Sequence, residues 1–442
     1  MNRVTLVALL ALAALSAACT RTPVRAMPPS PIVMQDERLD FARTVVPEKR
    51  TTEVSVLFAT TREQAPPDAP ERFTRRPGDA VRIGVARVQL GKPEWSFQEL
   101  AESDRTSRPD APRPARVVAV EEFGILGPPG GEAEREFIAA VDQQVETSAS
   151  GSVLFFVPGY RSTFDEMLTL MGSWGHFLGH QPVVAFSWPT GTWAWDYLTD
   201  CPRARAFVPD IARMIALIAE HTRARRINAM AFSCGGPLLA EALVQLRQAH
   251  PNDDAEALQK RYRIANTIFA AADIDLQTFT RSHVPALTDI AQHTVVYVSE
   301  NDSALRWAAF FSRASRLGRP RLDELTREDL QALQSNERLI GIDVTNVYGP
   351  HELTGARGHG YWVANQRVSS DVLLAMVYPF DPVWRGLVHP PGVGLWTFPD
   401  DYPQRVGGSI YQDMPELHRE EKYGGSPRGQ LPAPNQICCL RN

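Results

Sequence analysis

The sequence predicts an α/β fold in which a mostly parallel central sheet carries helices on both faces. Short apolar runs of strand type recur from residue 152 onwards, and longer amphipathic stretches separate them. Crossover helices of this kind connect parallel strands and bury the sheet from both sides. The strand-like runs are SVLFFV (152–157), PVVAFS (182–187), RINAMAF (226–232), RIANTIFAAA (263–272), TVVYVS (294–299) and IDVTNV (342–347).

The segments between these runs have apolar residues at three- and four-residue steps, which predicts helices. They are 165–178, 203–221, 236–248 and 303–313. Earlier in the chain, segments 53–59 and 81–90 are rich in β-branched residues and predict an opening pair of strands. Because ligands of open α/β sheets bind beyond the carboxyl ends of the strands, we expect reactive groups directly after strands.

Composition narrows the class of protein. Of the 442 residues, 44% are hydrophobic and 22% charged, which excludes a disordered, collagen-like or coiled-coil chain. The 46 Lys and Arg residues are outnumbered by 51 Asp and Glu residues, and the net charge of −5 argues against a nucleic-acid partner. The cysteines lack zinc-ligand spacing, so we expect no structural metal. We expect no other cofactor either.

The N-terminus has the plan of a secretory signal peptide over residues 1–18, because Arg3 precedes an apolar stretch that ends in small residues. Cys19 follows directly, and the segment resembles a bacterial lipobox with its leucine displaced by one position, at Leu15. We therefore expect that the protein is exported and that Cys19 is lipidated. Thr20, the residue after this cysteine, favours sorting of such lipoproteins to the outer membrane, so we expect a lipid anchor there that faces the periplasm. Ordinary cleavage after Ala18 is the alternative.

The chain divides into four parts by composition. The signal peptide is followed by a Pro-rich tether (19–50), the α/β domain (51–375) and a Pro/Gly-rich C-terminal extension (376–442). In an exported protein disulfides persist, and four cysteines remain: Cys201, Cys234, Cys438 and Cys439. Pairing of Cys201 with the tail and free thiols are both compatible with the sequence.

A candidate nucleophile follows the run that ends at Phe232. The chain continues Ser233-Cys234-Gly235-Gly236 and then enters a helix-like segment, which is the pattern of a nucleophile elbow. A serine on such a sharp turn has a strained backbone and leaves no room for large side chains two residues away on either side. The strand before and the helix after favour catalysis over simple packing at a tight turn.

The candidate acid is Asp302, which follows the run TVVYVS. An aspartate at this position is also a common helix N-cap, so a purely structural role is the alternative. Asp273 and Asp275 follow the preceding strand and are the second choice for the acid.

The candidate base is His359, in Gly358-His359-Gly360, with His351 as its competitor. We prefer His359 because its flanking glycines permit close backbone approach. The chain order Ser, Asp, His is the one expected of the α/β-hydrolase arrangement.

Two backbone N–H groups are candidates for an oxyanion hole. One belongs to Cys234, at the start of the helix after the nucleophile, and the other to Tyr160, in the Pro-Gly turn after the run SVLFFV. Four aromatic residues after the next strand would wall an acyl pocket or serve as packing: Trp188, Trp193, Trp195 and Tyr197.

Seven blocks of the sequence, in order, resemble the bacterial α/β hydrolases grouped as domain-of-unknown-function family 900, which are esterase- or lipase-like. The resemblance spans residues 53–374 and implies the α/β-hydrolase fold and a serine triad at Ser233, Asp302 and His359. The chain departs from the family at Pro158 and Phe232, where the family usually has histidine. The blocks are VSVLFATTR (54–62), FVPGYRSTF (156–164), FSWPTGT (186–192), AFSCGG (231–236), AADID (271–275), YVSENDSAL (297–305) and GHGYW (358–362).

The sequence thus predicts a serine hydrolase that cleaves a small-molecule or lipid carboxylic ester through an acyl-enzyme. An acyltransferase of the same fold uses the same intermediate and is the first alternative. The second is a non-enzymatic envelope lipoprotein in which the fold is a scaffold.

Overall fold

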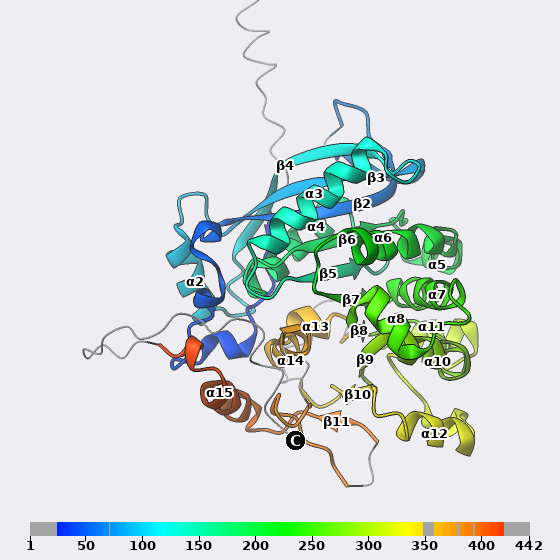
Figure 1. The fold of residues 1–442 in the computed structure, drawn as a ribbon. Coiled ribbons are helices and arrows are strands. Elements are labelled where there is room, and N and C mark those ends of the chain that lie inside the picture. The colour runs from blue at the N-terminus through cyan, green and yellow to red at the C-terminus, as the bar shows by residue number, and fades with distance from the viewer. Residues whose placement is uncertain (1–23, 70, 348–357, 378–380, 392–393, 420–442) are drawn as a thin grey trace, which may run out of the picture.

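The computed structural model describes residues 24–69, 71–347, 358–377, 381–391 and 394–419 (Figure 1). Their strands form one sheet in the order β1-β4-β3-β2-β6-β5-β7-β8-β9-β10-β11. From β2 to β11 every neighbouring pair is parallel. The strands that extend the sheet beyond β2 are antiparallel. The strands are β1 (Arg25–Ala26), β2 (Glu53–Gln64), β3 (Phe73–Leu90), β4 (Pro114–Ile125), β5 (Ser152–Val157), β6 (Val183–Ser187), β7 (Arg226–Phe232), β8 (Ile264–Ala270), β9 (Ala291–Val298), β10 (Leu339–Asp343) and β11 (Trp396–Thr397).

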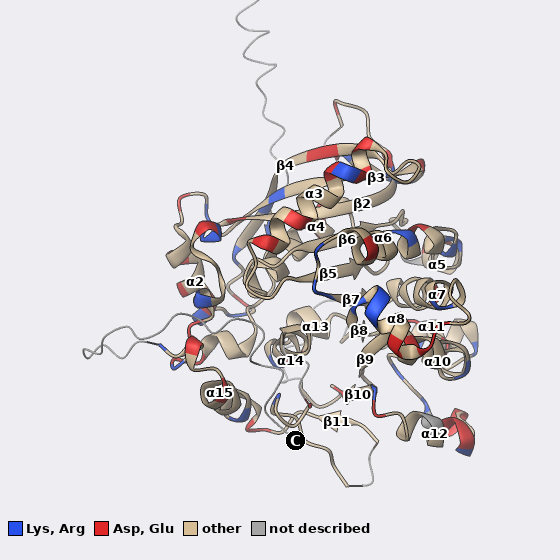
Figure 2. Cartoon of the chain, viewed as in Figure 1, with Lys and Arg blue, Asp and Glu red and all other residues tan. Residues whose placement is uncertain are grey.

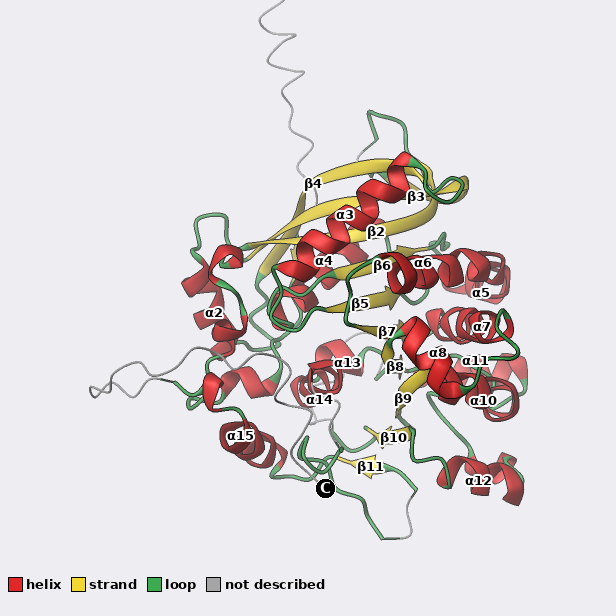
Figure 3. Cartoon of the chain, in the orientation of Figure 1, coloured by secondary structure: helices red, strands yellow, loops and turns green. Residues whose placement is uncertain are grey.

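Helices cover both faces of this sheet, which confirms the predicted fold class (Figure 3). Each face has its own apolar cluster, because the side chains of a strand alternate between the two faces. One cluster includes residues of α3 (Glu132–Glu146), α6 (Val208–His221), α7 (Gly235–Gln248), α8 (Ala255–Tyr262) and α10 (Val284–Ile290). The other includes residues of α2 (Phe97–Arg105), α4 (Phe164–Phe177), α14 (Gln366–Val377) and α15 (Tyr402–Asp413).

Five further α-helices complete the described chain. They are α5 (Tyr197–Arg203), α9 (Leu276–Thr278), α11 (Ser303–Ser312), α12 (Arg327–Gln334) and α13 (Tyr361–Ala364). Charged residues lie on the outer helices, such as α3, α8 and α12, whereas the central strands β5 and β6 contain none (Figure 2). Among the described residues, no helix combines the length and the apolar character that a bilayer span needs.

The central strands match their predictions closely, and the differences have local causes. β5 and β7 begin and end at the predicted residues. The last predicted run, 342–347, forms a strand only to Asp343, whose side chain accepts a hydrogen bond from the N–H of Thr345 at 2.8 Å and turns the chain. α6 begins at Val208 rather than at 203, with Pro209 in its first turn, where the ring is pre-organised for a helix.

The described part of the predicted tether packs against the domain, in contrast to the extended linker expected from its prolines. Residues 24–50 contain a strand and three 3₁₀ helices, η1 (Ile32–Gln35), η2 (Phe41–Thr44) and η3 (Pro47–Lys49). Their apolar side chains Met27, Val33 and Leu39 are buried. Proline excludes long regular helices here, but the apolar residues between the prolines still stabilise the segment by burial.

The described part of the C-terminal extension is also folded onto the domain. β11 adds to the sheet beside β10, and α15 buries Tyr402, Val406 and Ile410 in the second apolar cluster. A buried ion pair holds this segment to α14: Arg385 Nε lies 2.8 Å from Asp371 Oδ1, and the two side chains are 2% and 0% exposed. Tyr297 donates a further hydrogen bond to Asp371 at 2.7 Å.

We therefore predict that Arg385→Ala lowers the free energy of unfolding by about 3–5 kcal/mol, because it leaves the Asp371 carboxylate buried without its cation. Urea unfolding followed by circular dichroism measures the change. Arg405→Ala is the matched control, since its ion pair with Asp401 is exposed and contributes about 0–1 kcal/mol. Equal losses in the two variants would show that the C-terminal segment is not held by the buried pair.

Candidate active site

Ser233 lies on the sharp turn between β7 and α7, and its φ of 53° is in the left-handed region. The turn is held from both sides, because the N–H of Ser233 donates to the carbonyl of Ala270 at 3.0 Å and its carbonyl accepts from the N–H of Asp273 at 3.1 Å. A Cβ atom on Gly235 would lie 2.6 Å from the carbonyl oxygens of Val157 and Pro158. The predicted elbow and its need for glycine therefore have a direct steric cause.

The three predicted triad side chains meet at the carboxyl ends of the strands. His359 Nε2 lies 2.8 Å from Ser233 Oγ, and His359 Nδ1 lies 2.7 Å from Asp302 Oδ2. Because a carboxylate only accepts hydrogen bonds, Nδ1 carries the proton toward Asp302, and Nε2 is left to accept from the serine hydroxyl. Ser233 is 7% exposed and Asp302 is 0% exposed.

Asp302 is both the partner of the histidine and a helix cap. Its Oδ2 faces His359, while its Oδ1 accepts a hydrogen bond from the backbone N–H of Leu305 at 2.9 Å, in the first turn of α11. The two roles that the sequence offered for this residue are thus compatible, because each uses a different oxygen.

The other candidate acids and the competing histidine are not in this chain of hydrogen bonds. Asp273 accepts a hydrogen bond from the hydroxyl of Tyr197, and its Oδ1 lies 3.2 Å from Arg316 Nε. Burial raises the pKa of Asp273, and Arg316 opposes that shift. Asp275 caps α9 through the N–H of Thr278. His351 lies outside the described residues.

Aromatic side chains hold the histidine loop in place. The hydroxyl of Tyr361 accepts from the N–H of Ala271 and donates to the carbonyl of Tyr297, both at 2.7 Å, which ties the start of α13 to β8 and β9. Phe232, where the family usually has histidine, packs its ring against the imidazole of His359 at 4.9 Å between centroids. This contact shields one side of the imidazole from water.

The loop with the predicted oxyanion donor Tyr160 packs closely against the elbow. A Cβ atom on Gly159 would lie 2.8 Å from Phe232 Cδ1 and 3.1 Å from the Cβ of Ser233, so a larger residue would force the loop or the Phe232 ring to shift. The indole N–H of Trp188 donates to the carbonyl of Pro158 at 2.9 Å. Trp188 is fully buried, and this aromatic residue therefore belongs to the packing of the loop rather than to an open pocket.

A buried arginine, which the sequence analysis did not single out, holds the far end of the same loop. Arg62, at the end of β2, donates to the carbonyl of Ser162 at 2.6 Å and to Ser187 Oγ at 2.8 Å. Burial lowers its pKa to about 9. The only signal in the sequence is an arginine that ends an apolar strand, and that pattern is more typical of a solvated strand end.

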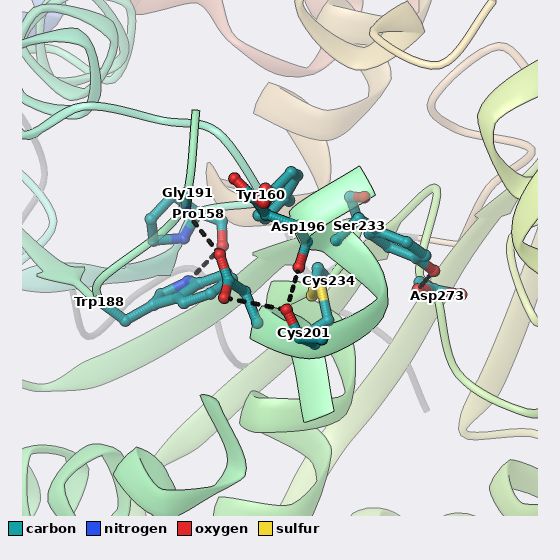
Figure 4. Close-up of a disulfide and its surroundings, with 12 residues drawn as sticks. Pro158, Tyr160, Trp188, Gly191, Asp196, Cys201, Ser233, Cys234 and Asp273 are labelled. Carbon is teal, nitrogen blue, oxygen red and sulfur yellow. Dashed lines mark hydrogen bonds between the residues drawn. A yellow bond between two sulfur atoms is a disulfide. The ribbon is translucent and has the colours of Figure 1, made fainter. Parts of the chain in front are cut away.

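A disulfide joins Cys201 to Cys234, the residue directly after the nucleophile (Figure 4). It ties α5 to the elbow, and Tyr160 adds a second tie by donating from its hydroxyl to the carbonyl of Trp193 at 2.8 Å. The sequence left Cys201 with the tail or free, and it offered no sign that Cys234 is the partner. Cys438 and Cys439 lie outside the described residues.

The fold and this chain of hydrogen bonds define an α/β hydrolase. The chain belongs to the family described as alpha/beta hydrolase of unknown function (DUF900), whose family model matches residues 133–375. No curated protein matches the chain.

Two similar solved structures are those of Thermogutta terrifontis esterase 2, phosphorylated by paraoxon and phosphoramylated by tabun. They are 13% and 12% identical to this chain, with a TM-score of 0.29 in both cases. The match covers 51% of this chain and 82% and 83% of those chains.

We predict that Cys201→Ser lowers the free energy of unfolding by about 3–4 kcal/mol, because the chain-entropy model gives that value for a closed loop of this size. The two cysteines are 33 residues apart. Urea unfolding with and without dithiothreitol measures the effect. Dithiothreitol should lower the stability of the wild type to that of the variant and leave the variant unchanged; equal sensitivity in both would contradict the assignment of this bond.

Proposed function

We propose that the chain is a serine hydrolase that cleaves carboxylic esters through an acyl-enzyme, with Ser233, His359 and Asp302 as its catalytic residues. The observation that carries the proposal is the continuous chain of hydrogen bonds from Ser233 Oγ through both ring nitrogens of His359 to Asp302. Such a chain activates a hydroxyl, which is a weak nucleophile in its neutral form.

In the first half-reaction Ser233 Oγ forms a bond to the ester carbonyl carbon while His359 Nε2 takes the hydroxyl proton. The tetrahedral intermediate then collapses, the bond to the alcohol oxygen breaks, and Nε2 returns the proton to the departing alcohol. Asp302 keeps Nδ1 protonated and stabilises the imidazolium. In the second half-reaction a water molecule attacks the acyl group by the same proton transfers and releases the acid.

The oxyanion hole in this proposal consists of the backbone N–H groups of Tyr160 and Cys234. Close packing of Gly159 against Ser233 brings the first donor to the elbow, and Cys234 follows the nucleophile at the start of α7. Among the described residues, neither N–H group has a hydrogen-bond acceptor within the protein. Donors of this kind typically stabilise the transition state by about 2.7–4 kcal/mol each.

We also propose that the protein is exported and acts in the cell envelope, with Cys19 as its point of lipidation. The Cys201–Cys234 disulfide supports export, because such bonds persist in oxidising compartments. Cys19 itself lies outside the described residues.

Ser233→Ala should abolish the hydrolysis of p-nitrophenyl esters, with kcat/KM reduced by about 10⁴-fold or more, because the nucleophile is lost. A fluorophosphonate probe should label the wild type and not the variant. Ser282→Ala, which changes an exposed serine, is the control and should keep both activities. Full labelling of Ser233→Ala would refute the assignment, and transfer of the acyl group to an added alcohol in preference to water would indicate an acyltransferase.

A pair of asparagine variants separates the two candidate acids. Asp302→Asn retains an oxygen to cap α11 but places an amide donor against Nδ1–H, which favours the wrong tautomer, so kcat should fall by about 10³–10⁴-fold. Asp273→Asn should change kcat by less than about tenfold, because its carboxylate contacts Tyr197 and Arg316. Ester hydrolysis under saturating substrate measures both. The reverse order of effects would make Asp273 the catalytic acid.

A further inference from the structure

The exposed tryptophan and phenylalanine side chains of the described residues all lie in two short segments. Their exposed fractions range from 56% to 70%. We call this set the aromatic rim, and it consists of Trp193, Trp195, Trp307, Phe310 and Phe311. Scattered single apolar residues are normal on a protein surface, but a group of large aromatic side chains marks an interaction site.

Both segments of the aromatic rim border the candidate active site. The first follows β6 and is held there by the hydrogen bond from Tyr160 to the carbonyl of Trp193 and by the disulfide of α5. The second is α11, which begins directly after the triad residue Asp302. Asp273 links the neighbouring residues of both segments, because it contacts Tyr197 next to the first segment and Arg316 beyond the end of α11.

Within each segment the rings pack against one another and still face solvent. Trp193 and Trp195 are stacked with 5.2 Å between ring centroids. Trp307 lies 6.1 Å from both Phe310 and Phe311, which are 5.6 Å from each other. Rings that are already ordered lose little conformational entropy when a second surface covers them.

The charges on the second segment of the aromatic rim are cationic. α11 contains no Asp or Glu, and the exposed side chains of Arg306 and Arg313 have no ion pair among the described residues. In the first segment the carboxylates are half-buried and bonded to the local backbone: Asp196 accepts from the N–H of Trp193 and Asp200 from the N–H of Gly191. Exposed aromatic rings beside unpaired arginines complement a lipid bilayer, because its acyl chains are apolar and its headgroups can be anionic.

We propose that the aromatic rim docks the candidate active site onto an anionic lipid surface, from which the enzyme takes amphiphilic ester substrates. The substrate class rests on the proposed function, whereas docking does not require catalysis. The occupant is a lipid surface rather than a second copy of the chain, because the unpaired arginines of α11 would repel those of the same helix in a second copy.

The first test measures binding of the full-length chain to vesicles of phosphatidylcholine with and without phosphatidylglycerol. All proteins carry Cys19→Ser, so that no acyl chain is attached there. Replacing Trp307, Phe310 and Phe311 together by serine should weaken binding to anionic vesicles by about tenfold or more. The matched control replaces Val118 and Val383 by serine, which are exposed apolar residues outside the rim, and should bind like the parent protein. Equal binding by all three proteins overturns the proposal.

A second measurement locates the contact independently of the N-terminal segment that all variants share. Lipids brominated in their acyl chains should quench part of the tryptophan fluorescence of the parent protein. Trp307→Phe keeps an aromatic ring but should lose a share of that quenching, and an unchanged quenched fraction would count against insertion of α11. Loss of self-association in the serine variant by ultracentrifugation, without loss of vesicle binding, would instead identify the rim as a contact between copies and overturn the proposal.

The two proposals fail in different ways. Ser233→Ala should still bind anionic vesicles, because the rim is intact. A wild type that binds vesicles but cleaves no ester would end the proposed function and leave docking standing. A wild type that cleaves p-nitrophenyl butyrate but binds no vesicle, and gains no rate when the ester is presented in vesicles, would end the docking proposal alone.

Discussion

The site depends on one buried carboxylate with two tasks. Asp302 holds the imidazole of His359 with one oxygen and caps α11 with the other, and the side chain is fully buried. A buried carboxylate is costly unless its oxygens are hydrogen-bonded, and here both are. The helix that this residue starts and the loop that carries His359 are therefore fixed relative to each other by the same group. Neither can shift far without leaving a charge unsatisfied.

Close backbone approach is the second constraint, and it explains where the glycines lie. Gly235 lies against the carbonyls that end β5, and Gly159 lies against Ser233 itself. Gly358, with φ of 89°, brings the histidine loop against Asn301, next to the acid. Three loops from three strand ends thus converge on one point because each has a residue without a side chain where they touch. The disulfide and Arg62 then hold the outer parts of these loops.

The sequence predicted those parts of the fold and the site whose cause is local. The apolar runs of β5 and β7 are buried on both faces, so their bounds can be read from composition alone. The elbow around Ser233 combines a strand, a helix and small residues within a few positions. His359 was preferred for its flanking glycines, and one of them, Gly358, does make the close contact.

What the sequence could not show depends on partners that are distant in the chain. Cys234 resembles any buried small residue until Cys201 is placed beside it. Arg62 lies two residues before the end of β2 and gives no sign that it reaches Ser162, which is 100 residues away. The Pro-rich composition of residues 24–50 indicated a linker, but Leu39 and its apolar neighbours find a partner surface in α14 and α15 that only the folded chain provides. The proline content of a segment indicates how stiff its backbone is, whereas the burial of its apolar side chains depends on the whole fold.

The position of α11 connects the exposed surface with the chemistry. The helix displays Trp307, Phe310 and Phe311 about one and a half to two and a half turns after the capping residue Asp302. Any contact made by these rings is therefore a contact with the element whose first turn is bonded to the candidate acid, Asp302. Because Asp302 is held by both oxygens, α11 is anchored at that end. The same helix is thus anchored to the candidate site by its cap, Asp302, and carries the exposed rings of the proposed docking surface.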